Sequence, residues 1–321
     1  MQDNNGIIFY GTPEFAVASL DAILKAGFTV KAVVTAPDRP AGRGLKLLQP
    51  EVKKYAVEHD IKVLQPVSLK DPGFLEELHQ INPVLQVIVA FRKLPAGVFT
   101  LPPLGTFNLH ASLLPKYRGA APINHAIMNG ETESGVTTFF LSEEIDTGNI
   151  LFAEKVSIRP DETAGELHDE LMVTGAILVV KTIQAIFGGT AVPVPQPAVT
   201  DPSDASYKAP KIHKEDCMID LTRKVEKVYN HIRGLSPYPG AFLTFTGTDG
   251  NDHLLKVYEC SGEIATHTKT VGSFITDGKS YLKIALADGY VNLTKIQLSG
   301  RKAMGIAEFL RGFAKLIPQT M

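Results

Sequence analysis

The segment 105–122 reads GTFNLHASLLPKYRGAAP and places an amide and an imidazole two positions apart, at Asn108 and His110. If residues 106–109 form a β-strand, both side chains lie on one face, because strand side chains alternate. An amide can donate hydrogen bonds to a developing oxyanion, and an imidazole can stabilise charge or carry a proton near neutral pH. The pair therefore indicates acyl transfer with no obvious nucleophile. Taken alone, it also suits a strand edge with satisfied polar groups.

A carboxylate that can complete this site lies in the segment EEIDTG, at 143–148. Asp146 falls in a polar loop between strands expected at 136–141 and 150–158. From there its carboxylate can orient the His110 ring and stabilise the charged form of the imidazole. Asp-Thr-Gly by itself also suits a plain turn, so only the convergence of the three side chains predicts catalysis.

The elements that must position these groups follow a regular rhythm in the first half of the chain. Short apolar runs alternate with amphipathic stretches, which predicts βαβ units around a parallel sheet. Strands are expected at 7–10, 30–35, 84–90 and 106–109, and helices at 14–26, 50–59, 73–80, 120–128 and 163–187. The last helix carries apolar residues at Leu167, Leu171, Ile177, Leu178 and Ile183. The Asn-His pair then falls at the carboxyl end of a strand, where open α/β sheets place their active crevice.

The composition changes to Gly, Pro, Ala, Ser and Thr between Gly188 and Pro210, and the prolines exclude a continuous helix or central strand. We therefore predict a catalytic domain at 1–188 and a linker at 189–207. Beyond it we expect a helix at 222–233 and strands at 241–245, 254–259, 273–275, 281–285 and 291–296. Short strands with turns at that spacing predict a small OB-like β-barrel at 208–321.

Length and charge agree with this division. A chain of 321 residues exceeds the usual size of one hydrophobic core. From Lys208 onward there are 16 Lys and Arg against 11 Asp and Glu, and before it 16 against 23. A basic C-terminal part suits a polyanionic partner, although a modest excess is as often a solvated face. Two cysteines, Cys217 and Cys260, support neither a disulfide framework nor a zinc site, and we predict no metal.

Targeting and nucleotide-binding signals are weak. No apolar run approaches the roughly 18 residues that span a bilayer. The first residues are polar and lack the secretory pattern, so we expect a cytoplasmic protein without membrane attachment. We also expect a monomer. GTPEF follows the first strand with one glycine rather than the pyrophosphate-binding G-x-G-x-x-G, so we predict no NAD.

An ordered series of motifs along essentially the whole chain resembles the methionyl-tRNA formyltransferase family. The motifs are FYGTPEFA (9–16), APDRPAGRG (36–44), FNLHASLLPKYRGAAPI (107–123), IDTGNI (145–150), SPYPGAF (236–242) and LSGRKAM (298–304). The resemblance implies an α/β fold, with a Rossmann-like formyltransferase domain followed by an OB-like barrel. It also implies formyl transfer from 10-formyltetrahydrofolate to the α-amino group of methionyl-initiator tRNA. Catalytic roles then fall to Asn108, His110 and Asp146.

The resemblance further assigns tetrahydrofolate binding to the SLLP segment, which comprises Ser112, Leu113, Leu114 and Pro115. The stretch VAFRKLP at 89–95 departs from the family's VAYG-like segment and is similar to glycinamide ribonucleotide formyltransferase. We therefore expect Phe91, Arg92 and Leu94 to frame the folate pterin in a somewhat different way.

The PDRPAGRG loop, by the same resemblance, contacts the acceptor end of the tRNA. Arg39, Arg43 and Lys46 can meet phosphates, while the glycines permit rearrangement. A solvated basic loop is the alternative, since three positive side chains are common on protein surfaces.

Two other functions remain open at this point. Another formyltransferase with the same triad can act on an amino sugar nucleotide or on glycinamide ribonucleotide, although neither substrate accounts for the PAGRG loop. A noncatalytic RNA-binding protein would need only the basic OB-like domain, and it would leave the polar triad without a role.

Overall fold

The computed structural model describes residues 6–41, 46–199, 201 and 204–318. The chain divides into two compact units. Unit 1 comprises Met1–Gly119, Glu133–Ser157 and His168–Lys208, and unit 2 comprises Ala120–Thr132, Ile158–Leu167 and Ala209–Met321. Two short segments that precede α6 or include its first residues therefore belong to the unit that is built mainly from the C-terminal third.

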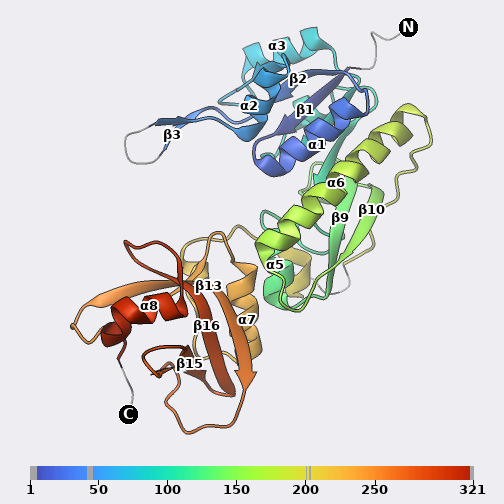
Figure 1. The fold of residues 1–321 in the computed structure, drawn as a ribbon. Helices are drawn as coiled ribbons and strands as arrows, with labels where there is room; N and C mark the ends of the chain where they lie inside the picture. The colour runs from blue at the N-terminus through green and yellow to red at the C-terminus, as the bar shows by residue number, and fades with distance from the viewer. Residues whose placement is uncertain (1–5, 42–45, 200, 202–203, 319–321) are drawn as a thin grey trace. The chain divides into compact units, whose positions relative to one another are not determined.

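Unit 1 contains a seven-stranded sheet with the order β10-β9-β7-β6-β1-β2-β5. Figure 1 labels β1, β2, β9 and β10 of this sheet. Its strands are β1 Ile7–Gly11, β2 Val30–Val34, β5 Lys62–Leu64, β6 Leu85–Val89, β7 Thr106–His110, β9 Glu133–Phe140 and β10 Ile150–Ser157. The first five in sequence pair in parallel, and β9 runs antiparallel to both β7 and β10. β1 and β6 are buried along their whole length, which requires apolar residues on both faces. The expected Rossmann-like, mainly parallel sheet is confirmed.

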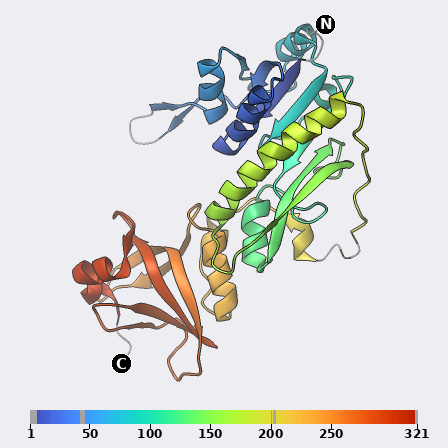
Figure 2. The same cartoon turned by 45° about the vertical axis from the view of Figure 1, so that its right-hand side comes forward.

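Helices cover both faces of this sheet. In unit 1 these are α1 Glu14–Lys25, α2 Glu51–Glu58, α3 Pro72–Ile81, α4 Ala96–Phe99 and α6 Ala164–Phe187 from His168 onward. The helix α5 Pro122–Asn129 belongs to unit 2. Side chains of α3 and α4 pack with Ile8, Tyr10 and Ile88 on one face. On the other face, Gly175 of α6 lies so close to Leu109 that a Cβ there would stand 2.7 Å from Leu109 Cδ2. α6 therefore lies along the sheet beside β9 and β10 (Figures 1 and 2).

One residue of the expected apolar face of α6 is not in the core. Leu171, Leu178 and Ile183 are buried as expected, but Ile177 is 66% exposed. Each helical residue turns by about 100°, so Ile177 falls on the side opposite the buried residues. α6 is also the one helix among the described residues that could cross a membrane by length and composition. A core helix of a soluble protein meets the same test, and α6 buries one side against the sheet.

Several short elements were not predicted from the sequence. A two-stranded hairpin joins β3 Arg39–Ala41 and β4 Lys46–Leu48, and β8 Arg118–Gly119 pairs with β11 Lys208–Ala209. Short 3-10 helices occupy Ala205–Tyr207, Glu215–Cys217 and Ala314–Leu316. Runs of two or three residues are too short to produce a hydrophobic period, so periodicity cannot reveal them.

Unit 2 contains a curled antiparallel sheet with the order β12-β13-β16-β15-β14, and β17 pairs with β16. Its elements are α7 Val225–Gly234, β12 Ala241–Thr246, β13 Asp252–Ile264, β14 Phe274–Thr276, β15 Leu282–Leu286, β16 Gly289–Leu298, β17 Met304–Gly305 and α8 Ile306–Phe313. Phe245 of β12 and Phe274 of β14 pack edge to face at 5.3 Å, so the curl brings the outer strands together. The result is a half-barrel consistent with the expected OB-like fold.

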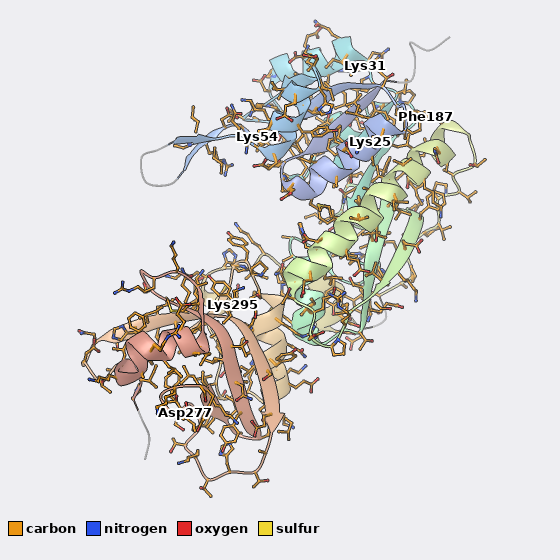
Figure 3. The ribbon with its side chains drawn as sticks, viewed as in Figure 1. Lys25, Lys31, Lys54, Phe187, Asp277 and Lys295 are labelled. Carbon is orange, nitrogen blue, oxygen red and sulfur yellow. The ribbon has the colours of Figure 1, made fainter. Side chains whose placement is uncertain are left out.

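The turn between β14 and β15 carries Asp277 (Figure 3). Its carboxylate accepts hydrogen bonds from Ser280 Oγ and from the backbone amides of Ser280 and Lys279. These donors stabilise the charged form and hold the pKa of Asp277 well below its usual range. The aspartate therefore closes the turn that joins the two strands.

Candidate active site

β7 carries Asn108 and His110 at the carboxyl edge of the parallel strands. Asn108 pairs with Ile88 of β6, and Ile88 belongs to the core on the α3 and α4 face. Asn108 and His110 therefore share that face, whereas Leu109 points to α6. The Asn108 side chain is half-buried and makes no hydrogen bond to any residue that the structure describes. Its amide group is thus available as a donor.

His110 is buried, with 6% of its surface exposed, and its ring is fixed from one side. The ring Nε2 lies 2.8 Å from the carbonyl oxygen of Tyr117. A carbonyl only accepts hydrogen bonds, so Nε2 carries a hydrogen in both the neutral and the charged imidazole. The other ring nitrogen, Nδ1, lies 3.9 Å from Asp146 Oδ2.

Asp146 reaches this position from the loop between β9 and β10. Its side chain is 15% exposed, and its Oδ2 accepts a hydrogen bond of 3.0 Å from the Gly119 amide. The backbone of Asp146 adopts a left-handed conformation with φ 55°, which Asp tolerates better than most residues. The loop is also tightly packed, because a Cβ at Gly148 would stand 1.6 Å from the Phe140 carbonyl oxygen.

The SLLP segment divides into two buried and two half-buried residues. Ser112 and Leu114 are buried, and Ser112 Oγ donates to the Lys116 carbonyl at 2.6 Å. Thr137 fastens the segment to β9, since its hydroxyl donates to the Ser112 carbonyl and accepts from the Leu114 amide. Leu113 and Pro115 keep part of their surface accessible. Of the predicted folate residues in this segment, Leu113 and Pro115 are therefore the two whose side chains can contact a ligand.

The segment 91–94 follows β6 and lies at the same edge of the sheet. Arg92 is tied down, because its guanidinium donates to the carbonyls of Pro66 and Val67 at 2.5 and 2.9 Å. Leu94 is 2% exposed and belongs to the core. Among the described residues, the backbone amides and carbonyls of 91–94 find no hydrogen-bond partner. They offer a short row of open donors and acceptors.

Phe91 packs against a buried tyrosine beneath this segment. The rings of Phe91 and Tyr10 pack edge to face, with their centroids 5.6 Å apart and their planes at 61°. The Tyr10 hydroxyl has no partner within the described parts of the chain, and burial raises its pKa well above the ordinary value. Tyr10 therefore stays neutral and supports Phe91 by packing.

Two of the three predicted tRNA residues, Arg39 and Lys46, belong to the strands of the β3–β4 hairpin, away from the triad in sequence. Arg39 is exposed and pairs with Leu48 in the hairpin ladder. Lys46 is the first residue of β4, and Arg43 lies outside the described residues. Leu47 and Leu48 are 68% and 59% exposed, so the hairpin presents apolar as well as basic side chains.

Metal-ligating groups do not cluster in the described ranges. No set of three or more His, Cys, Asp or Glu side chains there is close enough to hold a metal ion. Cys217 and Cys260 are free cysteines.

Three partners of the triad escaped the sequence reasoning: the Tyr117 carbonyl, the Gly119 amide and the side chain of Gln196. The first two are backbone groups, which every residue carries, so no residue type marks them. Gln196 falls in the stretch whose prolines and small residues predicted a linker. A single polar residue among prolines gives no periodic signal.

Comparison with known proteins identifies the class. A model of the formyl transferase family matches residues 5–183, and a model of the formyl transferase C-terminal domain matches residues 211–314. The fold and these matches define a formyltransferase with an additional C-terminal domain.

Relatives with the same length then identify the family within this class. Methionyl-tRNA formyltransferase of Parabacteroides distasonis is 47% identical over 316 residues, which cover 98% of each chain. Its namesake from Flavobacterium johnsoniae is 48% identical over 307 residues and 95% of each chain. The chain belongs to the methionyl-tRNA formyltransferase family.

Solved structures of lower identity share the fold. A sugar 3N-formyl transferase solved with dTDP and 5-N-formyl-THF has a TM-score of 0.62 at 21% identity, covering 93% of this chain and 99% of that one. A methionyl-tRNA formyltransferase from Clostridium thermocellum has a TM-score of 0.53 at 18% identity, covering 81% and 94%. At these identities the likeness concerns the fold alone.

Proposed function

We propose that this protein transfers the formyl group of 10-formyltetrahydrofolate to the α-amino group of methionyl-initiator tRNA. The product is the N-formylmethionyl-tRNA that initiates translation. The observation that carries this conclusion is the near-full-length identity of 46–48% to relatives named methionyl-tRNA formyltransferase. No class of substrate other than an aminoacyl-tRNA is named among these relatives.

The residues at the sheet edge fit a folate donor. A pterin is flat and carries an amide-like row of donors and acceptors along one edge. The open backbone groups of 91–94 match such a row, and the accessible surfaces of Leu113 and Pro115 can pack on a flat ring. These features support the proposed folate roles of Ser112–Pro115 and of Phe91, Arg92 and Leu94, with Ser112, Leu114 and Leu94 acting by packing or by holding the backbone.

The geometry of the triad supports direct transfer. The neutral amine attacks the formyl carbon, a C–N bond forms, and the carbonyl electron pair moves to oxygen. The free amide of Asn108 and a protonated His110 stabilise that oxyanion. Collapse of the intermediate breaks the bond to N10 of the folate, which receives a proton as the attacking nitrogen loses one. An α-amine has a pKa of about 7.7 to 8, so enough of it is neutral at physiological pH.

Asp146 supports this reaction through Nδ1 of His110. The two atoms lie 3.9 Å apart, within ion-pair range but beyond a hydrogen bond. The carboxylate is therefore close enough to pair with a protonated imidazole, and Nδ1 is not taken up in a hydrogen bond with it. It can equally position a water that relays the amine proton.

A substrate comparison tests the function. We expect transfer to charged initiator methionyl-tRNA with a kcat/KM at least about 10³-fold above that for an amino sugar nucleotide or glycinamide ribonucleotide. Formylation of the sugar nucleotide without formylation of the tRNA would instead establish the alternative formyltransferase. Binding of tRNA with no product from any acceptor would establish a noncatalytic RNA-binding protein.

We propose that the β3–β4 hairpin meets the tRNA backbone through Arg39, Arg43 and Lys46. Replacing the exposed Arg39 with alanine should raise the KM for methionyl-tRNA by about threefold to tenfold. It should also reduce the slope of log kcat/KM against log salt concentration by about one. The KM for the folate donor should stay the same. The matched control is Lys25→Ala, which removes an exposed cation at the end of α1 (Figure 3). Equal effects in both variants would contradict a specific role for the hairpin.

We further propose a catalytic domain at 1–188, a linker at 189–207 and a tRNA-binding domain at 208–321. The two family matches, at 5–183 and 211–314, support a domain boundary within this linker. We propose that the protein acts in the cytoplasm as a monomer without membrane attachment, a location supported by its relationship to enzymes named for methionyl-tRNA.

A further inference from the structure

The segment that follows α6 lies against the loop that carries Asp146. Val194 and Ile150 form an antiparallel bridge in which each amide donates to the other's carbonyl, at 2.7 and 2.8 Å. Ile150 is the first residue of β10 and comes directly after that loop. The bridge therefore places Gln196, two residues further on, beside the loop.

Both the nitrogen and the oxygen of the Gln196 side-chain amide form hydrogen bonds there. Its Nε2 donates to the carbonyls of Asp146 and Gly148 at 2.8 and 2.9 Å. Its Oε1 accepts from Nε and Nη2 of Arg118 at 3.2 and 2.5 Å. A guanidinium only donates and carbonyls only accept, so the amide has one workable orientation. A carboxylate at this position would keep Arg118 and repel both carbonyls.

Further contacts link the segment after α6 to the neighbours of both His110 and Asp146. Arg118 precedes Gly119, whose amide holds Asp146 Oδ2. On the other side, the Tyr117 amide donates to the Ser206 carbonyl at 2.7 Å, and the Tyr117 carbonyl fixes the His110 ring. The segment after α6 therefore contacts neighbours of both side chains: Ser206 binds Tyr117, which holds His110, and Gln196 binds the main chain of Asp146.

We propose that Gln196 is a positioning residue for formyl transfer, holding the main chain of the 146–148 turn so that Asp146 faces His110 Nδ1. The role rests on the proposed function of the triad. Gln196 itself contacts no reacting group: it acts through the carbonyls of Asp146 and Gly148 and is braced by Arg118. The left-handed backbone at Asp146 is the conformation that these two hydrogen bonds hold.

Two variants test this role. Gln196→Leu removes the hydrogen bonds at similar volume, and Gln196→Glu keeps only the contact with Arg118. Both should lower kcat by about tenfold to thirtyfold, the effect of losing two neutral hydrogen bonds, while the KM values for folate and tRNA change less than about twofold. The matched control is Gln184→Leu, an exposed glutamine on α6 in the same unit, which should retain full kcat.

Hydrogen exchange of the 141–149 loop supplies a readout that does not depend on activity. We expect faster exchange there in Gln196→Leu, with the melting temperature within a few degrees of the unchanged protein. Full kcat in Gln196→Leu, or an equal loss in Gln184→Leu, would overturn the proposal. A wild-type protein that forms no formylated tRNA would overturn the proposed function instead, and the exchange of the loop would still report whether Gln196 holds it.

Discussion

Asn108→Ala should lower kcat for formyl transfer by about 10²- to 10³-fold, the usual effect of removing one oxyanion donor. The Asn108 amide is half-buried and has no hydrogen-bond partner among the described residues, so its loss breaks no hydrogen bond within the described fold. The KM values for both substrates should change little, because the interaction forms mainly in the transition state. Single-turnover transfer from 10-formyltetrahydrofolate to methionyl-tRNA measures the effect on the chemical step.

Two further variants sharpen this experiment. Asn108→Asp keeps the shape but replaces the donor with a carboxylate that repels an oxyanion, so it should be slower than Asn108→Ala. Asn149→Ala removes an exposed asparagine from the same unit and should leave kcat unchanged. Near-normal single-turnover rates in folded Asn108→Ala would show that another group stabilises the oxyanion.

Asp146→Asn should lower kcat by about 10²- to 10⁴-fold, the range for loss of a positioned acid–base partner. The substitution keeps the volume and an oxygen that can accept from the Gly119 amide, so the loop contact at 3.0 Å can persist. It removes the negative charge that lies 3.9 Å from His110 Nδ1. The charged imidazole then loses its partner. Initial rates and thermal melting, measured on the same preparations, separate this loss from unfolding.

The chain offers a matched control for this prediction. Asp169 pairs with the neighbouring His168 at 2.9 Å on α6, and its side chain is 76% exposed. Asp169→Asn removes a carboxylate from an aspartate–histidine pair outside the site and should leave kcat unchanged. The double variant His110→Ala with Asp146→Asn should be no slower than about the slower single variant, because the two residues act as a unit. If the loss of kcat in the double variant equalled the product of the two single losses, the two residues would have independent roles.

The main strands and helices of unit 1 could be predicted because each buries a continuous or periodic apolar surface. β1, β6 and β7 lie within a residue or two of the expected positions, and the two-residue spacing of Asn108 and His110 places them on one face. In unit 2 the alternating strands were also recognisable. β13 proved longer than expected, running from Asp252 to Ile264, because its outer residues are polar and carry no apolar signal.

Other features depended on long-range packing. The exposure of Ile177 follows from which side of α6 the sheet covers, and its apolar side chain gives no hint of that choice. α8 was not expected, although it buries Phe309 and Leu310 in the core of unit 2.

The order of apolar runs, the Asn-x-His spacing and the run of motifs determined the class of fold, the family and the chemistry to be expected from this chain. Local sequence suffices for these because alternation in a strand and residue type are properties of neighbouring positions. Only the tertiary structure decided how Asp146 meets His110, that Tyr117 and Gly119 act through their backbones, and that Gln196 braces the loop. Those contacts join residues between seven and 50 positions apart, and hydrogen bonds over such separations depend on where the folded sheet brings the segments together.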